Sequence, residues 1–438
     1  MEPWLSTVVI FASLIAALVL GLPIAFALSG LGIILMMILQ GPQSLMIVSS
    51  FLFDQGSSFI LVAVPLFVIM ANFLEVSDIA DDLYNAMYKW TAAIPGGLAS
   101  GTVIICAIFA AMAGISGVAT MTMGLIAIPS MLKRNYDKRL VVGTVCAGGA
   151  LGILIPPSVI AVLYGSITGS SVGQLFMGGM MPGILLALIF IGYISARCFI
   201  QPHLGPPTGE VYSWKEKLVS LKAVILPLLL IALVLATIYF GVCTPTEAAG
   251  FGAFGSMICL IIYRKFNWPN IKIAVLRSFN ITVMCIWIVF GAHCFTAVYT
   301  MAGASSFMLS LVDNLAIPPI GFILIMQLIW FVLGMLLDPI GMLMVTIPVF
   351  LPIVQALGFD PIWFGVLFIV NCEMAYITPP FGFNLFYMKA IVPKEVTMTD
   401  VYISIVPFVA CQALCLVLVM LFPQIALWLP SMMFGAVK

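Results

Sequence analysis

Apolar segments separated by short polar ones occupy most of the chain of 438 residues. A helix needs about 20 mostly apolar residues, each rising about 1.5 Å, to cross about 30 Å of hydrocarbon. Ten segments meet this requirement and are predicted to be membrane-spanning helices. They are residues 3–20, 22–40, 56–75, 140–167, 173–199, 223–242, 245–263, 272–298, 361–391 and 400–422.

Two further apolar segments, 94–132 and 317–357, are interrupted halfway by small or polar residues. The interruptions are Ala113–Gly117 and Leu337–Gly341. Each limb is too short to cross a bilayer comfortably. A re-entrant helical hairpin therefore explains each segment better than two short spans, which remain the alternative.

The chain also matches itself at a shift of 223 positions. Pro129 then falls on Pro352, and Pro156-Pro157 falls on Pro379-Pro380. The predicted spans follow the same shift, which indicates an internal repeat of the kind that builds many secondary transporters. Five parts result. They are the scaffold helices of repeat 1 (1–92), its hairpin and broken helix (93–199), a cytoplasmic linker (200–222), the scaffold helices of repeat 2 (223–315), and the second hairpin, broken helix and last span (316–438).

Charge is scarce and unevenly placed. The chain is 63% hydrophobic and 7% charged, whereas soluble proteins carry about 25% charged residues. Its net charge of zero offers no basic patch for nucleic acid. If the basic loop 133–139 is cytoplasmic, alternation through the spans places every Lys and Arg except Lys438 inside. The repeat counterpart of this loop, 358–361, has no basic residue. The positive-inside rule thus predicts inverted repeats, with both termini outside the cytoplasm.

Neither the cysteines nor the first span indicates secretion. The ten cysteines lie mostly in apolar segments without zinc-like spacing, so small buried hydrophobic residues are expected rather than disulfides or a metal site. Segment 3–20 has no basic residues before it and no Ala-x-Ala site, so we expect a retained span rather than a signal peptide.

Two places in each half interrupt a helix deep in the predicted membrane: the hairpin tip and the Pro-Pro pair. Each Pro-Pro pair removes two amide donors and forces the preceding residue out of the helical conformation. Such backbone is tolerated in a bilayer where it is buried or lines a cavity. The freed carbonyls can coordinate a cation, and the resumed helices near Ser158 and Gly382 direct partial positive charge at an anion. A plain proline kink is the alternative.

Asp338 is the main candidate among the intramembrane acids. A charged Asp at mid-bilayer costs about 2.5–3.5 kcal/mol, and no Lys or Arg is close in sequence, so bound Na⁺ would balance it. A helix N-cap or a protonated acid is the alternative. Glu373 is equally consistent with a coupling group, an ion ligand or a helix–helix contact. His293 is expected to make a helix–helix hydrogen bond, and Asn384 is a candidate substrate contact.

Sequence motifs of other classes are absent. The chain has no Walker A sequence, no HExxH helix and no nucleophile elbow, so neither ATP-driven transport on this chain nor enzymatic activity is expected.

Several segments resemble the large membrane subunit of tripartite ATP-independent periplasmic (TRAP) transporters. They are AMAGISGVAT, KRNYDKR, GGALGILIPPSVIAVLYG, GMLLDPIGMLMVTIPVFLP and ITPPFGFNLF. The resemblance covers essentially the whole chain. It implies an all-α polytopic protein of the bacterial or archaeal inner membrane that imports a small organic acid, a carboxylate or sulfonate, with Na⁺ by an elevator movement. It also implies two partners, a periplasmic substrate-binding protein and a small four-helix membrane subunit, expected here as a separate chain.

The resemblance also implies the residues of the site. Sodium would be bound by Gly114, Ile115, Ser116, Gly117, Gly152, Pro156, Gly334, Asp338, Gly341, Tyr376 and Thr378. The organic anion would contact Ser116, Ser158, Thr378, Gly382 and Asn384. Many family members have Ser-Gly-Ser-Ser at the first tip, whereas this chain has Ser-Gly-Val-Ala, which leaves fewer side-chain oxygens there. No Arg or Lys is expected in the binding region. A proton-coupled transporter or exporter using His293 or Glu373 is the alternative, and an ion channel is the alternative of another class.

Overall fold

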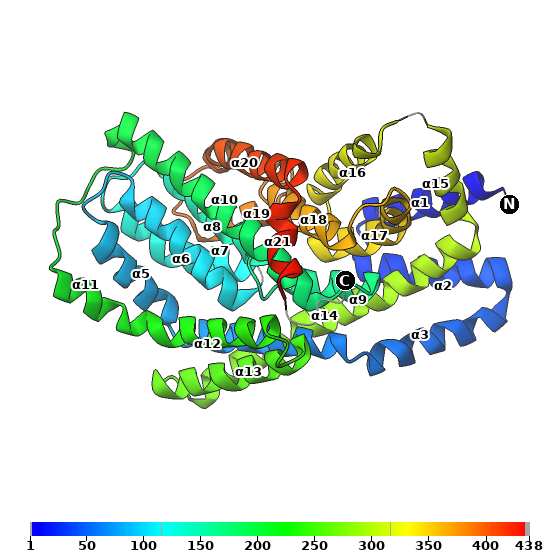
Figure 1. The fold of residues 1–438 in the computed structure, drawn as a ribbon, viewed down its shortest axis with the longest axis horizontal. Coiled ribbons are helices and arrows are strands. Elements are labelled where there is room, and N and C mark those ends of the chain that lie inside the picture. Colours follow the sequence, from blue (N-terminus) through cyan, green and yellow to red (C-terminus); the bar gives the residue numbers. More distant parts are fainter. Residues whose placement is uncertain (1, 115, 316, 434–438) are drawn as a thin grey trace.

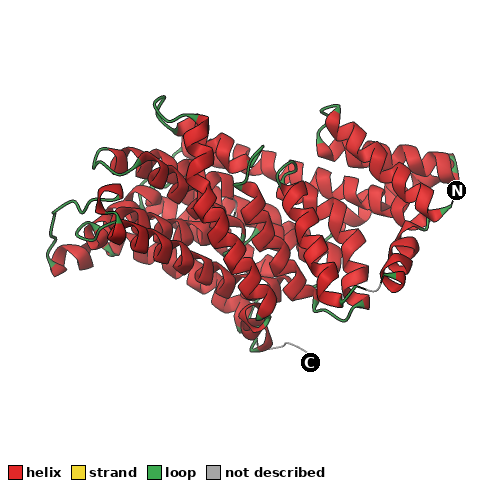
Figure 2. Cartoon of the chain, turned by 90° about the horizontal axis from the view of Figure 1, so that it is seen from above, coloured by secondary structure: helices red, strands yellow, loops and turns green. Residues whose placement is uncertain are grey.

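A computed structural model describes residues 2–114, 116–315 and 317–433, and every regular element in these residues is a helix (Figure 2). The first half comprises α1 (Pro3–Val19), α2 (Ile24–Gln40), α3 (Leu45–Ser57), α4 (Ala63–Glu75), α5 (Ile79–Thr91), α6 (Gly97–Ala113), α7 (Ser116–Leu132), α8 (Lys138–Ala150), α9 (Val159–Thr168) and α10 (Val172–Ile200). The second half comprises α11 (Trp214–Ser220), α12 (Lys222–Tyr239), α13 (Pro245–Ile262), α14 (Trp268–Met301), α15 (Ala304–Asn314), α16 (Pro319–Gly334), α17 (Pro339–Ala356), α18 (Pro361–Tyr376), α19 (Phe383–Ile391), α20 (Met398–Leu421) and α21 (Gln424–Ser431).

The helices confirm most predicted spans. Among the described residues, five helices are long and apolar enough to cross a membrane: α10, α13, α14, α17 and α20. Two more candidates are bent pairs, residues 42–57 with 60–75 at 58° and residues 214–220 with 224–239 at 50°. The prediction for 56–75 missed α3, which ends in the Gly-Ser-Ser run at Gly56, a sequence that favours a helix break.

Each half contains the predicted hairpin (Figure 1). In the first hairpin α6 ends at Gly114, whose φ of 60° is left-handed, and α7 begins at Ser116. In the second, α16 ends at Gly334 and α17 follows the Asp338 N-cap. Three of the four limbs are shorter than 18 residues, as expected, but α17 reaches 18, so its length alone would also permit a span.

The Pro-Pro pairs interrupt their helices as predicted. Between α8 and α9 the chain forms a short turn, Leu151–Ile153, and then a non-helical segment with Pro156-Pro157. Between α18 and α19 the non-helical segment contains Pro379-Pro380. Both Pro-Pro peptide bonds are cis. A plain kink in a continuous helix is therefore wrong for both sites.

The contacts between helices follow the internal repeat of the sequence. A shift of about 223 residues along the sequence aligns α2 with α13 and α4 with α14. In the structure each helix packs against the counterpart of the other, α2 against α14 and α4 against α13. Likewise α9 packs against α17 while α19 packs against α7. Such reciprocal contacts are expected when the two repeats are related by a pseudo-twofold axis. The five spans predicted for the first half are an odd number, so the second copy would enter the membrane in the opposite orientation.

Candidate functional site

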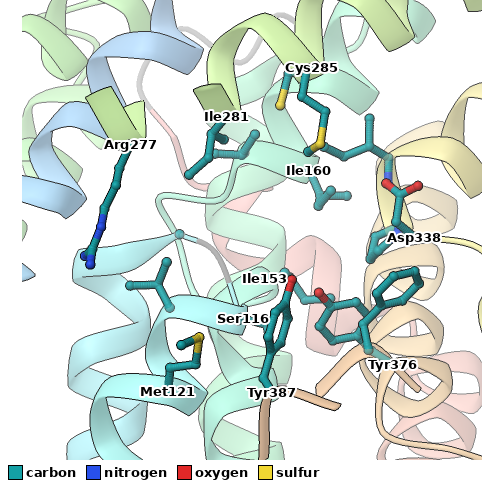
Figure 3. Close-up of a pocket in the computed structure, with 18 of the residues that line it drawn as sticks. Ser116, Met121, Ile153, Ile160, Arg277, Ile281, Cys285, Asp338, Tyr376 and Tyr387 are labelled. Atoms are coloured by element: carbon teal, nitrogen blue, oxygen red, sulfur yellow. The ribbon is translucent and has the colours of Figure 1, made fainter. Parts of the chain in front are cut away.

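The broken elements of both halves meet around a cavity of ≈ 630 Å³. Both hairpin tips, both Pro-Pro regions and the helices α4 and α14 contribute to its walls. Figure 3 shows Asp338 and Tyr376 on one side of this cavity, Arg277 on the other, and Tyr387 between them. The lining includes Gly114, Ser116, Gly117, Ile153, Val159, Asp338, Tyr376 and Tyr387 together with Asn72, Glu75, Arg277 and Asn280.

The first hairpin tip packs directly on the first Pro-Pro region. A Cβ atom added to Gly114 would lie 2.6 Å from the carbonyl oxygen of Pro157. The left-handed φ of 60° also favours glycine at this position. Position 114 therefore requires glycine, both for its backbone conformation and for its close approach to the Pro157 carbonyl. This contact holds the hairpin tip beside the carbonyl groups that the Pro-Pro pair leaves without amide partners.

A hydrogen bond joins the first tip to the second broken helix. The Asn384 amide donates to Ser116 Oγ over 2.7 Å, and both side chains are buried. The amide oxygen Oδ1 of Asn384 is also buried and has no hydrogen-bond partner among the described residues. Buried polar atoms are normally satisfied, so an unpartnered oxygen here is a place where a bound ligand could be coordinated.

Asp338 caps α17 and still faces the cavity. Its Oδ2 accepts hydrogen bonds from the amides of Ile340 at 3.1 Å and Gly341 at 3.2 Å. The N-cap alternative is therefore confirmed as a structural role. The carboxyl group also lines the cavity, and among the described residues it forms no ion pair. Capping engages one oxygen and leaves Oδ1 for a ligand.

The second Pro-Pro region presents aromatic and hydroxyl groups. Tyr376 lines the cavity and stacks on Phe383, with ring centres 5.7 Å apart. Thr378 donates its hydroxyl to the carbonyl of Met374 over 2.6 Å. Gly382 has a φ of 34° and begins the resumed helix α19. On the first side, Ser158 caps α9 and donates to the carbonyl of Ile153 over 2.5 Å, so its hydroxyl already has a structural partner.

The predicted site residues fall into two groups. Five line the cavity: Gly114, Ser116, Gly117, Asp338 and Tyr376. Others belong to the same broken segments without forming its wall: Gly152, Pro156, Ser158, Gly334, Gly341, Thr378, Gly382 and Asn384. Ile115 lies outside the described residues.

Arg277 is one of several cavity-lining residues that the sequence did not predict, along with Asn72, Glu75, Asn280 and Tyr387. It lines the cavity from α14 and forms an ion pair with Glu75 at 2.9 Å, so the expectation of a binding region without Arg or Lys is wrong. Thr122 of α7 also lies near Glu75, with its hydroxyl 3.5 Å from Oε1. The available signal was that Glu75 ends one predicted span and Arg277 lies near the start of another, with opposite charges.

Two other intramembrane polar residues lie away from the cavity lining. Glu373 is fully buried in α18, and both of its carboxyl oxygens lack a hydrogen-bond partner among the described residues. His293 of α14 packs its ring beside Phe51, with centres 6.0 Å apart. Neither is positioned to contact a ligand in the cavity directly.

The donor atoms around the cavity suit a hard cation and an anion together. The described residues contain no group of three or more His, Cys, Asp and Glu side chains that could hold a metal ion. What they offer is carbonyl, hydroxyl, amide and carboxyl oxygens, the ligands preferred by hard cations. The guanidinium of Arg277 at the other side suits a carboxylate or sulfonate.

Comparison with known families decides the class. Residues 11–425 match the model of the family described as "Tripartite ATP-independent periplasmic transporter, DctM component". The chain belongs to this family. It is the large permease component of a TRAP transporter, a multi-pass membrane protein, and its relatives are transporter permeases rather than enzymes.

Named relatives support the assignment over the whole length. The C4-dicarboxylate TRAP transporter large permease protein DctM of Vibrio cholerae is 32% identical, covering 98% of this chain and 99% of that protein. The isethionate TRAP transporter permease protein DctMQ of Oleidesulfovibrio alaskensis is 29% identical, covering 96% of this chain and 66% of that protein. The fold resembles the Alcanivorax borkumensis YdaH transporter, with a TM-score of 0.63 at 15% identity over 89% of this chain and 90% of that one.

Proposed function

We propose that this TRAP permease imports a small organic acid together with Na⁺ across the inner membrane. The observation that carries the proposal is the convergence of both hairpin tips, both Pro-Pro regions and the Asp338 carboxyl on one cavity. Interrupted helices of inverted repeats bring carbonyl oxygens and helix N-termini to the same depth, where they bind coupling ions and anions in secondary transporters.

The proposed ion region includes Asp338 and the freed backbone of the two tips. Asp338 would supply the one formal negative charge, and the neutral oxygens near Ser116 and Asn384 would supply the rest. A cation held there would offset the unpaired carboxylate, which otherwise is costly at mid-membrane. The first tip has few hydroxyl side chains, so main-chain oxygens and the unpartnered Asn384 amide oxygen would carry more of its site.

The proposed substrate is an organic anion, a carboxylate or sulfonate. Relatives named for C4-dicarboxylate and isethionate transport carry anions of this class. The charge complement in this chain would come from the N-terminus of α19 and bound cations rather than from a lysine cluster. Arg277 also lines the cavity, but it is already paired with Glu75. With the sidedness predicted from charge, Arg277 lies at the cytoplasmic end of the cavity.

The proposed movement is of the elevator type. The parts 93–199 and 316–438 would move as a transport domain against the scaffold helices of 1–92 and 223–315, linked by 200–222. The Thr122–Glu75 contact joins α7 to α4 and would break in such a movement. A periplasmic binding protein would deliver the acid, and a separate small membrane subunit would complete the assembly, as the family description and the fused DctMQ relative suggest.

The proposal is tested by uptake into proteoliposomes containing the permease, the small subunit and the binding protein. A thermal-shift panel of organic acids on the binding protein first selects the substrate. We expect uptake that saturates with loaded binding protein and accelerates when Na⁺ is higher outside than inside.

Two outcomes would contradict the proposal. Uptake that follows an imposed proton gradient and ignores Na⁺ would favour proton coupling, for which Glu373 and His293 are the candidate groups. Large ionic currents that need neither binding protein nor acid would indicate a channel.

A further inference from the structure

A second cavity lies between α5, α6 and α12, apart from the proposed transport site. Its volume is ≈ 420 Å³, and its walls are almost entirely apolar. Met87 and Trp90 of α5, Ile104 and Ile108 of α6, and Val224 and Leu228 of α12 form them. Nothing in this cavity can hydrogen-bond a polar ligand extensively, so its occupant must be largely hydrocarbon.

One basic residue, Lys217, lies at one end of this cavity, and two more are close to it in sequence. The Lys217 ammonium lies 5.9 Å from the ring centre of Trp90 and 5.5 Å from that of Trp214, and Trp90 Nε1 donates to the Lys217 carbonyl over 3.3 Å. Lys215 and Lys222 flank it in sequence at α11 and at the start of α12. We call these three residues the lysine rim.

The lysine rim is not neutralised within the chain. None of its members forms an ion pair with a described residue. Glu216 lies between two of these lysines in sequence and offsets one of their three charges. Its carboxylate accepts hydrogen bonds from the Ser213 amide at 2.9 Å and the Ser213 hydroxyl at 2.7 Å. A net positive charge therefore remains in this segment, and Lys217 at the end of the apolar cavity is available to an external anion.

The side chains around this end of the cavity are those typical of a bilayer surface. Trp214 is 72% exposed and Leu218 is 59% exposed, although both are large apolar residues of the short helix α11. Tryptophan beside lysine is typical of the membrane–water interface, where the ring lies at headgroup level and the ammonium reaches the polar region. Lysine clusters at the end of a spanning helix attract anionic lipids.

We propose that this cavity binds one anionic phospholipid, with an acyl chain between α5, α6 and α12 and its phosphate on the lysine rim. The charge of the rim and the apolar walls together match an amphipathic anion. A helix of the small subunit fits less well, because a helix about 10 Å wide fills this volume with a single turn. The lipid would sit between α12 and the first limb of hairpin 1, a position independent of the sodium and substrate sites.

The test uses the permease with its small subunit in nanodiscs of equal parts phosphatidylcholine and phosphatidylglycerol, followed by native mass spectrometry of retained lipid. We expect one tightly retained phosphatidylglycerol. The triple variant Lys215→Gln, Lys217→Gln, Lys222→Gln should weaken its retention by roughly fivefold per lysine. Ile108→Trp, which places a larger ring in the cavity and leaves the rim intact, should also weaken retention.

The matched control, Lys133→Gln, Lys272→Gln, Lys394→Gln, removes the same charge elsewhere and should change nothing. Equal retention of both lipids, equal loss in the control, or unchanged retention in both cavity variants would overturn the proposal. Loss of the lipid whenever the small subunit is present would assign the cavity to the subunit interface instead. Because binding is measured without transport, the result is independent of the proposed sodium coupling.

Discussion

Replacing Asp338 by Asn is expected to lower the apparent Na⁺ affinity of uptake by roughly a hundredfold. A unit charge 4 Å from a cation contributes about 4 kcal/mol at an effective dielectric constant of about 20, and water in the cavity would screen part of this. Asn can still accept the amide hydrogens of Ile340 and Gly341, so the α17 cap should survive. The measurement is the initial uptake rate in proteoliposomes as a function of external Na⁺.

The chain provides a matched control for this substitution. Asp360 also precedes a proline, caps a helix and accepts from two amides, those of Ile362 at 2.7 Å and Trp363 at 3.3 Å. It is exposed and lies outside the cavity. Asp360→Asn should leave the Na⁺ dependence unchanged. Equal behaviour of the two variants would remove Asp338 from the ion site and leave it as a cap alone.

Replacing Gly114 by Ala is expected to reduce Na⁺-driven uptake at least tenfold. A left-handed Ala costs about 1 kcal/mol in backbone conformation. The added Cβ would also lie 2.6 Å from the Pro157 carbonyl oxygen, a backbone atom that cannot rotate away. The first tip must therefore separate from the Pro-Pro region, which displaces the carbonyls proposed to bind the ion. The uptake rate and the thermal unfolding temperature of the purified permease would be measured on the same preparation.

Gly169 provides a control that separates the cost of the left-handed backbone from the steric clash. It ends α9 with a φ of 70°, and no atom lies within 4 Å of its added Cβ. Gly169→Ala carries the same conformational cost without the clash, so uptake within about twofold of the parent chain is expected. A similar loss in both variants would show that backbone conformation alone matters and that the close approach of tip and Pro-Pro region does not.

The sequence was sufficient for the repeated framework. Small and polar residues at 113–117 and 337–341 predict the interruptions at both hairpins, and the matches of Pro129 with Pro352 and of the two Pro-Pro pairs predict the repeat. Charge distribution added the inverted relation, because basic residues concentrate on one side. These features depend on composition and spacing, which are readable along a chain.

Contacts between distant segments were not readable in this way. The hydrogen bond from Asn384 to Ser116 joins residues 268 positions apart, and the pair of Arg277 with Glu75 joins residues 202 apart. Arg277 lies within the predicted span 272–298, near its cytoplasmic end, and the sequence alone does not show whether this position faces a cavity, lipid or another helix. Only the packing of α4 against α14 shows that this end of the span borders the cavity.

The most direct test of coupling at the paired tips is the flux of the ion itself. Radioactive sodium would be supplied outside proteoliposomes holding the complete transporter, and its entry followed when acid-loaded binding protein is added. We expect sodium to enter with the acid in the parent chain and its entry to be lost with Asp338→Asn at the same external concentration. Acid entry with no accompanying sodium in the parent chain would contradict the account.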